Sequence, residues 1–108
     1  MRILFDNGTP EPLIPLLGGH NVTTAIAAGW ERLENGDLLS AAERAGFEVL
    51  MTTDKNIRYQ QNLSGRRIAL IVLGNSNWNV ARLHVEKIVA AVNAATVGSY
   101  IEVEIPFR

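Results

Sequence analysis

The chain has 108 residues, of which 47% are hydrophobic, and a formal net charge of −1 at pH 7, so we expect one domain over residues 1–108 with a core large enough to fold alone. It contains no cysteine and two widely separated histidines, which excludes disulfides and Cys-type zinc sites and leaves oxygen atoms to hold any metal. No run approaches the ~18 apolar residues of a membrane span, and no signal-peptide pattern is present, so we expect a cytoplasmic protein that does not bind a membrane.

The first half of the chain predicts two strands, a short helical turn and a longer helix. The strands are expected over about residues 2–6 and 21–26, and the helical turn between them should end near Gly18. Apolar residues then recur at the spacing of one helix face: Leu38, Ala41, Ala42 and Ala45. This helix should begin at or just before Asp37 and end at Gly46, because glycine is typical of the position after a helix C-terminus.

The second half predicts two buried strands, one long helix and a final edge strand. The buried strands are expected over residues 48–53 and 68–73, and the second should lie inside the sheet because it is an unbroken apolar run. One long helix should then bury a set of apolar side chains: Val80, Leu83, Ile88, Ala91, Val92 and Ala95. Residues 100–105 alternate apolar and acidic side chains, as in a half-solvated edge strand, before Pro106 prevents further pairing.

This alternation predicts an α/β fold, with one three-layer domain that has a mainly parallel sheet of about five strands and helices on both faces. With right-handed crossovers, the strands take the order 2-1-3-4, and the last strand lies at an edge. The first and third strands are then neighbours, about 4.8 Å apart. Their carboxyl ends meet at the edge where open α/β sheets bind their ligands.

Each of these two neighbouring strands is followed by an aspartate. Asp6 follows the apolar run Ile3–Phe5, and Asp54 follows the strand expected over residues 48–53. Because a carboxylate is costly to desolvate unless a cation shares its site, we expect the pair to bind a divalent metal. Aspartate is also a typical turn-forming residue, which is the alternative role for each of them.

Asp37 is a third candidate metal ligand. A helix that begins there would enter from the carboxyl edge of the sheet, so its carboxylate could turn toward the same pocket. The alternative is a purely helical role, since aspartate is favoured at the N-cap and in the first turn for electrostatic reasons.

The loop after Asp54 contains cations, a ring and side-chain amides: Lys55, Arg58, Tyr59, Gln60, Gln61 and Asn62. Cations can neutralise phosphates, a tyrosine ring can stack on a base, and amides can hydrogen-bond to it. This composition favours single-stranded nucleic acid beside the metal site. The alternative is a solvated loop whose arginines pair with the acidic stretch between Glu31 and Asp54.

Four segments carry a resemblance to a known family: Ile3-Leu4-Phe5-Asp6, Gly19-His20-Asn21-Val22, Asp37-Leu38-Leu39 and Thr52-Thr53-Asp54-Lys55-Asn56. They resemble the opening strand with its acid, the entry to the second strand, the acid-led helix and the Thr-x-Asp ending of PIN-like nuclease domains. The resemblance is to the short, truncated bacterial branch of these domains. It covers most of the chain, and the Thr-x-Asp ending is its most specific part.

The resemblance implies a metal-dependent ribonuclease that acts on RNA, often as the toxin of a toxin–antitoxin pair that a small antitoxin-like protein inhibits. Asp6, Asp37 and Asp54 then take the roles of ligands to Mg²⁺ or Mn²⁺, and the metal would lower the pKa of the attacking water. Such proteins commonly form homodimers, for which the strand expected over residues 100–105 offers one surface.

Four residues are the expected substrate contacts: Lys55, Arg58, Tyr59 and Gln61.

Two departures from the family pattern leave other functions open. Asn7 stands where this branch frequently has a second acid, and the glutamate that larger PIN domains place on an early helix has no clear counterpart. Fewer carboxylates mean weaker metal affinity, so one alternative is a catalytically silent module that binds a partner protein or RNA. A receiver-like phosphoacceptor domain also has acids after its first and third strands, but it requires a lysine after its last strand, where this chain has Pro106, Phe107 and Arg108.

Overall fold

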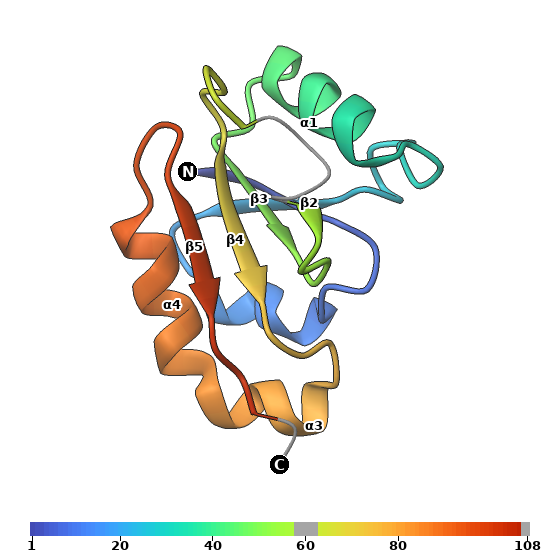
Figure 1. Ribbon diagram of the computed structural model, residues 1–108. Helices are drawn as coiled ribbons and strands as arrows, with labels where there is room; N and C mark the ends of the chain where they lie inside the picture. Colours follow the sequence, from blue (N-terminus) through green and yellow to red (C-terminus); the bar gives the residue numbers. More distant parts are fainter. Residues whose placement is uncertain (58–62, 107–108) are drawn as a thin grey trace.

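The computed structural model describes residues 1–57 and 63–106 (Figure 1). The strands are β1 (Arg2–Phe5), β2 (Asn21–Thr24), β3 (Val49–Thr52), β4 (Ala69–Leu73) and β5 (Tyr100–Val103). The helical elements are η1 (Glu11–Leu16), α1 (Asn35–Arg44), α3 (Trp78–Ala81), η2 (Arg82–His84) and α4 (Val85–Ala94). Each described element lies within or close to a segment for which the sequence predicts the same type of structure.

The five strands form one parallel sheet in the order β2-β1-β3-β4-β5. Ile3 of β1 is in register with Val49 of β3, which is in register with Ala69 of β4. The predicted α/β class, the strand order and the neighbouring positions of the first and third strands are therefore confirmed. β5 pairs with β4 alone and is an edge strand, as its alternating sequence indicates.

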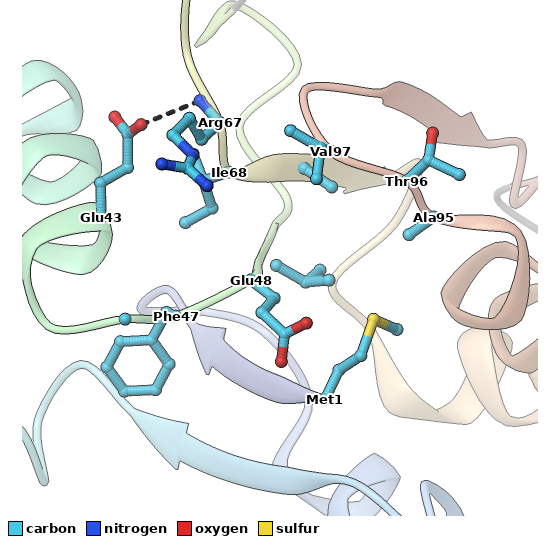
Figure 2. A pocket seen from close by; sticks show the side chains of 12 residues that line it. Met1, Glu43, Phe47, Glu48, Arg67, Ile68, Ala95, Thr96 and Val97 are labelled. Atoms are coloured by element: carbon cyan, nitrogen blue, oxygen red, sulfur yellow. Dashed lines mark hydrogen bonds between the residues drawn. The ribbon is translucent and has the colours of Figure 1, made fainter.

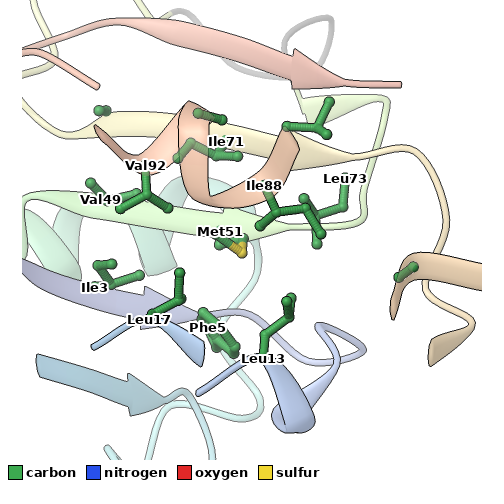
Figure 3. Packing of buried hydrophobic residues seen from close by; sticks show 14 of the residues in the cluster. Ile3, Phe5, Leu13, Leu17, Val49, Met51, Ile71, Leu73, Ile88 and Val92 are labelled. Carbon is green, nitrogen blue, oxygen red and sulfur yellow. The ribbon is translucent and has the colours of Figure 1, made fainter. Parts of the chain in front are cut away.

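Helices cover both faces of the sheet, which gives the predicted three layers (Figure 1). On one face, Leu38, Leu39 and Ala42 of α1 pack against the side chains that point that way from β1, β3 and β4. On the other face, η1, α3 and α4 cover the alternate side chains of the same strands. Figure 3 shows this second cluster, with Ile88 and Val92 of α4 beside the strands.

The prediction of a single long helix near the C-terminus is wrong in one respect. Residues 78–94 form α3, the 3₁₀ turn η2 and α4 in succession. A 3₁₀ turn has three residues per turn instead of 3.6, so it shifts the helical face. Leu83 lies in this turn and is 64% exposed, although the helical spacing predicts that it is buried.

Helix α1 begins earlier than the sequence predicts. Its first residue is Asn35, its N-cap is Glu34, and Asp37 is its third residue. The first helical hydrogen bond runs from the backbone N–H of Leu38 to the carbonyl of Glu34, at 2.7 Å. This difference of two residues decides which side chain the helix presents to the sheet edge.

No helix in the described part of the chain is both long enough and apolar enough to cross a membrane.

Candidate acidic site at the carboxyl edge of the sheet

The two aspartates that follow β1 and β3 lie at the same edge of the sheet. Asp6 comes directly after β1, and its backbone N–H donates to the carbonyl of Met51 in β3 at 2.9 Å, which continues the pairing of the two strands. Asp54 comes two residues after the end of β3. Both side chains are half-buried. The structure therefore brings both ends to one edge, as the parallel topology predicts.

Thr52 connects the two aspartates through one hydroxyl group. It is the last residue of β3 and is fully buried. Its Oγ1 donates to Asp6 Oδ2 at 2.8 Å and accepts from the backbone N–H of Asp54 at 3.1 Å. Because a buried hydroxyl needs hydrogen-bond partners, this geometry fixes both the hydroxyl and the orientation of the Asp6 carboxylate.

Asp6 also forms part of a turn, as the alternative interpretation of the sequence holds. Its Oδ1 accepts from the backbone N–H of Asn7 at 2.8 Å, and its carbonyl accepts from the N–H of Thr9 at 3.1 Å. The Thr9 hydroxyl donates to the Met51 carbonyl at 3.1 Å, which ties the turn to β3. The turn and the carboxylate site are compatible, because each oxygen of the carboxylate can accept more than one bond.

Asp54 has a hydrogen bond on each of its carboxylate oxygens. Oδ1 accepts from the backbone N–H of Asn56 at 2.9 Å, which is the turn that the sequence suggests. Oδ2 accepts from the side-chain amide Nδ2 of Asn35 at 2.8 Å. We call Asp6, Thr52, Asp54 and Asn35 the acidic network.

Asp37 does not belong to this network. It lies in the first turn of α1 and its side chain is exposed. Among residues 1–57 and 63–106, no three His, Cys, Asp or Glu side chains are grouped in a way that could hold a metal ion. The predicted set of three carboxylates is therefore not assembled in the described structure. The position of Asp37 suits its alternative role, since an acid near a helix N-terminus interacts favourably with the helix dipole.

The acidic network fits a hydrated divalent cation better than a fully ligated one. Mg²⁺ is commonly held by one or two carboxylates while it keeps several water molecules or binds substrate phosphates. Asp6 and Asp54 supply two carboxylates, and all four of their oxygens already accept a hydrogen bond that fixes their orientation. Each oxygen has a second lone pair for a metal or a water.

Two of the pockets that the described residues line lie at this edge of the sheet. One, of about 530 Å³, adjoins Asp6 at the ends of β1 and β2. Its lining includes Asn7, Glu11, Pro12, Ile26 and Glu31. The other, of about 480 Å³, lies at the ends of β4 and β5 and contains Lys55 with Glu102 and Glu104. Lys55, a predicted substrate contact, is exposed and shares its pocket with two acids.

A larger pocket, of about 610 Å³, lies at the opposite edge, where β3 and β4 begin (Figure 2). At its rim, Glu43 Oε1 accepts from Arg66 Nη1 at 2.6 Å, and Oε2 accepts from the backbone N–H of Arg67 at 2.9 Å. Burial alone would raise the pKa of the Glu43 carboxyl. The bonds from Arg66 and Arg67 outweigh burial and lower this pKa below its ordinary value. This contact joins α1 to the segment that enters β4.

Sequence reasoning missed Asn35 and gave Thr52 no role beyond its place in a motif. Thr52 carried a signal, because a hydroxyl in an otherwise apolar buried strand requires a partner. The one sequence signal for Asn35 is its spacing, because it lies three and four residues before Leu38 and Leu39 and therefore on the same helix face. The predicted substrate contacts Arg58, Tyr59 and Gln61 lie outside the described residues.

Comparison of the chain with models of protein families, with curated proteins and with solved structures finds no match.

Proposed function

We propose that this protein is a PIN-like, metal-dependent ribonuclease whose active site is the acidic network. The observation that carries the proposal is the pair Asp6 and Asp54, which the hydroxyl of Thr52 links at the carboxyl ends of adjacent parallel strands. Two carboxylates whose oxygens are each oriented by a hydrogen bond at this edge are arranged for a cation more readily than for a purely structural role. The motifs shared with PIN-like domains support the same assignment.

In this proposal Asp6 and Asp54 would hold Mg²⁺ or Mn²⁺. The bound ion would lower the pKa of a water molecule, so that hydroxide can attack a phosphodiester of RNA. The protein's own contribution is preorganisation. Thr52 orients the Asp6 carboxylate, while Asn35 and the backbone of Asn56 orient that of Asp54. These side chains need little rearrangement when charge develops on the phosphate.

In this proposal the protein is a cytoplasmic toxin that a small antitoxin-like protein inhibits. The proposal also holds that the protein forms a homodimer. Lys55, which directly follows Asp54 in the chain, is a cation that could offset phosphate charge. A gene for a small antitoxin-like protein directly beside the gene for this chain would support the toxin assignment.

The decisive test is cleavage of a labelled single-stranded RNA by the purified protein, freed of any partner, with Mn²⁺ or Mg²⁺. We expect Asp54→Asn to abolish cleavage, because it removes one of the two carboxylate charges while it preserves the shape of the side chain. Glu86→Gln is the matched control, since Glu86 is an exposed acid in the first turn of α4. Equal residual activity in the wild type and in Asp54→Asn would refute the nuclease assignment.

A second candidate is a catalytically silent PIN-like module that binds RNA or a partner protein. The observation in its favour is that Asp37 stays outside the acidic network, which leaves two carboxylates where three are expected. This function predicts RNA or partner binding in a calorimetric or mobility-shift assay that is unchanged by Asp54→Asn, together with no cleavage in Mn²⁺.

The sheet order is also that of receiver domains, so a phosphoacceptor function keeps one observation in its favour. Acetyl phosphate would then form an acid-labile phosphate on Asp54, which intact-mass measurement detects. The segment after β5, Glu104-Ile105-Pro106, has no lysine to serve such a site.

A further inference from the structure

Helix α1 contributes the side chain of Asn35 to the acidic network, through its hydrogen bond to Asp54. We propose that Asn35, and not Asp37, is the residue through which α1 acts on this site, and that its neutral amide sets the affinity of the site for a divalent cation. The inference rests on the proposed metal-dependent function and names a positioning residue for it.

The geometry of α1 separates the two residues. Successive helical residues are about 100° apart around the axis, so Asn35 and Asp37 differ by about 200°. Asn35 shares a face with Leu38 and Leu39, three and four residues later, and both leucines are buried against the sheet. The same periodicity directs Asp37 to the opposite, exposed side of the helix. Asp37 could reach the network only if the first turn of α1 rotated and exposed the leucines.

The contact of Asn35 has the spacing of neighbouring ligands. Its Nδ2 lies 2.8 Å from Asp54 Oδ2. In octahedral coordination with bonds of about 2.1 Å, adjacent ligand atoms are about 3.0 Å apart. A carboxylate oxygen at the place of this amide nitrogen would therefore be close enough to Asp54 Oδ2 to share one cation with it.

The amide has a different effect from a carboxylate at the same place. It donates a hydrogen bond that holds Asp54 in one orientation, and it adds no negative charge. The network then carries the two charges of Asp6 and Asp54. Because the affinity of oxygen sites for hard cations rises with the number of charged ligands, this arrangement favours weak, hydrated binding. The side chain at position 35 thus determines the affinity of the acidic network for a divalent cation.

The test measures Mn²⁺ binding by titration calorimetry in the absence of RNA. We expect Asn35→Asp to bind Mn²⁺ about tenfold more tightly than the wild type, because it supplies the third charged ligand. Asp37→Asn, which removes a carboxylate two residues away, should match the wild type within about twofold. Equal affinity of Asn35→Asp and the wild type, or a marked loss of affinity in Asp37→Asn, would overturn the inference.

A second measurement covers the case in which Asn35→Asp folds poorly without metal, because two carboxylates at this spacing repel one another. Mn²⁺ should raise the Tm of this variant more than that of the wild type, since at a given concentration the stabilisation of the folded state by a ligand increases with the logarithm of its affinity. Asn35→Ala, which removes the hydrogen bond to Asp54 Oδ2, should bind Mn²⁺ about tenfold more weakly than the wild type. Unchanged binding in Asn35→Ala and an equal Tm shift in Asn35→Asp contradict the proposed role.

These outcomes are independent of the nuclease assay. If Asn35→Asp gains Mn²⁺ affinity but no variant cleaves RNA, the metal role of Asn35 stands and the ribonuclease assignment fails. If the wild type cleaves RNA and Asn35→Asp gains no affinity, the ribonuclease assignment stands and the role of Asn35 fails.

Discussion

Thr52 shows how much one buried hydroxyl contributes at the scale of a single residue. It has no solvent contact, and it serves Asp6 as a donor and Asp54 as an acceptor. A residue with both functions couples the two aspartates, so that the orientation of one carboxylate depends on the backbone position of the other. Its neighbour Thr53 is half-buried.

We predict that Thr52→Val destabilises the protein by about 1–2 kcal/mol, because it leaves the backbone N–H of Asp54 without its partner in a partly buried site. Thr52→Ser keeps the hydroxyl and should restore most of that stability, apart from the loss of one methyl group. Urea unfolding of both variants at pH 7 measures the difference. A Thr52→Val variant as stable as the wild type would show that the hydroxyl contributes nothing to folding.

At the scale of the element, α1 depends on contacts at both of its ends. Its first residue, Asn35, binds Asp54 at the carboxyl edge of the sheet, and near its last turn Glu43 binds Arg66 and the backbone of Arg67. The buried face between these ends packs on the sheet. Hydrogen bonds therefore hold α1 at both of its ends.

We predict that Glu43→Gln lowers the free energy of unfolding by about 1 kcal/mol at pH 7. Because the folded state lowers the pKa of Glu43, this contribution is complete above the ordinary value near 4.5 and is lost as the pH falls through the lowered pKa. Urea unfolding of the wild type and the variant should show the difference at pH 7 and a much smaller one at pH 3. A difference that persists unchanged at pH 3 would contradict the assignment to an ionised Glu43.

At the scale of the whole molecule, helices cover both faces of the sheet. The segment that follows β5 runs close to the residue that follows β4. Gly74, which directly follows β4, donates its backbone N–H to the carbonyl of Val103 at 2.9 Å. A Cβ atom at Gly74 would lie 2.8 Å from the backbone nitrogen of Ile105. The close approach of these two segments requires glycine at this position.

We predict that Gly74→Ala destabilises the protein by about 1–3 kcal/mol, because the added methyl group would force the segment after β5 away from β4. Gly18→Ala is the control, since a Cβ there meets no atom within 4 Å among the residues described. Thermal unfolding of the two variants should show a lower Tm for the first and little change for the second. Equal Tm values would mean that the segment after β5 can move away from β4 without loss of stability.

The apolar sequence by itself determined most of the architecture. Continuous runs such as 68–73 are typical of strands that are buried on both faces, and the alternation with helical segments implies parallel pairing and right-handed crossovers. These rules are enough to place Asp6 and Asp54 at one edge of the sheet, because a parallel topology directs the ends of neighbouring strands to the same side.

The tertiary structure alone decided which other side chains reach that edge. Helical spacing predicts a buried face but leaves the first residue of α1 uncertain by two positions, and this small shift exchanges Asn35 for Asp37 at the acidic network. The 3₁₀ turn before α4, which exposes Leu83, is likewise not indicated by the helical spacing of the sequence. Secondary-structure patterns repeat every two or 3.6 residues, whereas a hydrogen bond requires its two atoms within about 3 Å, and only the packed chain determines that distance.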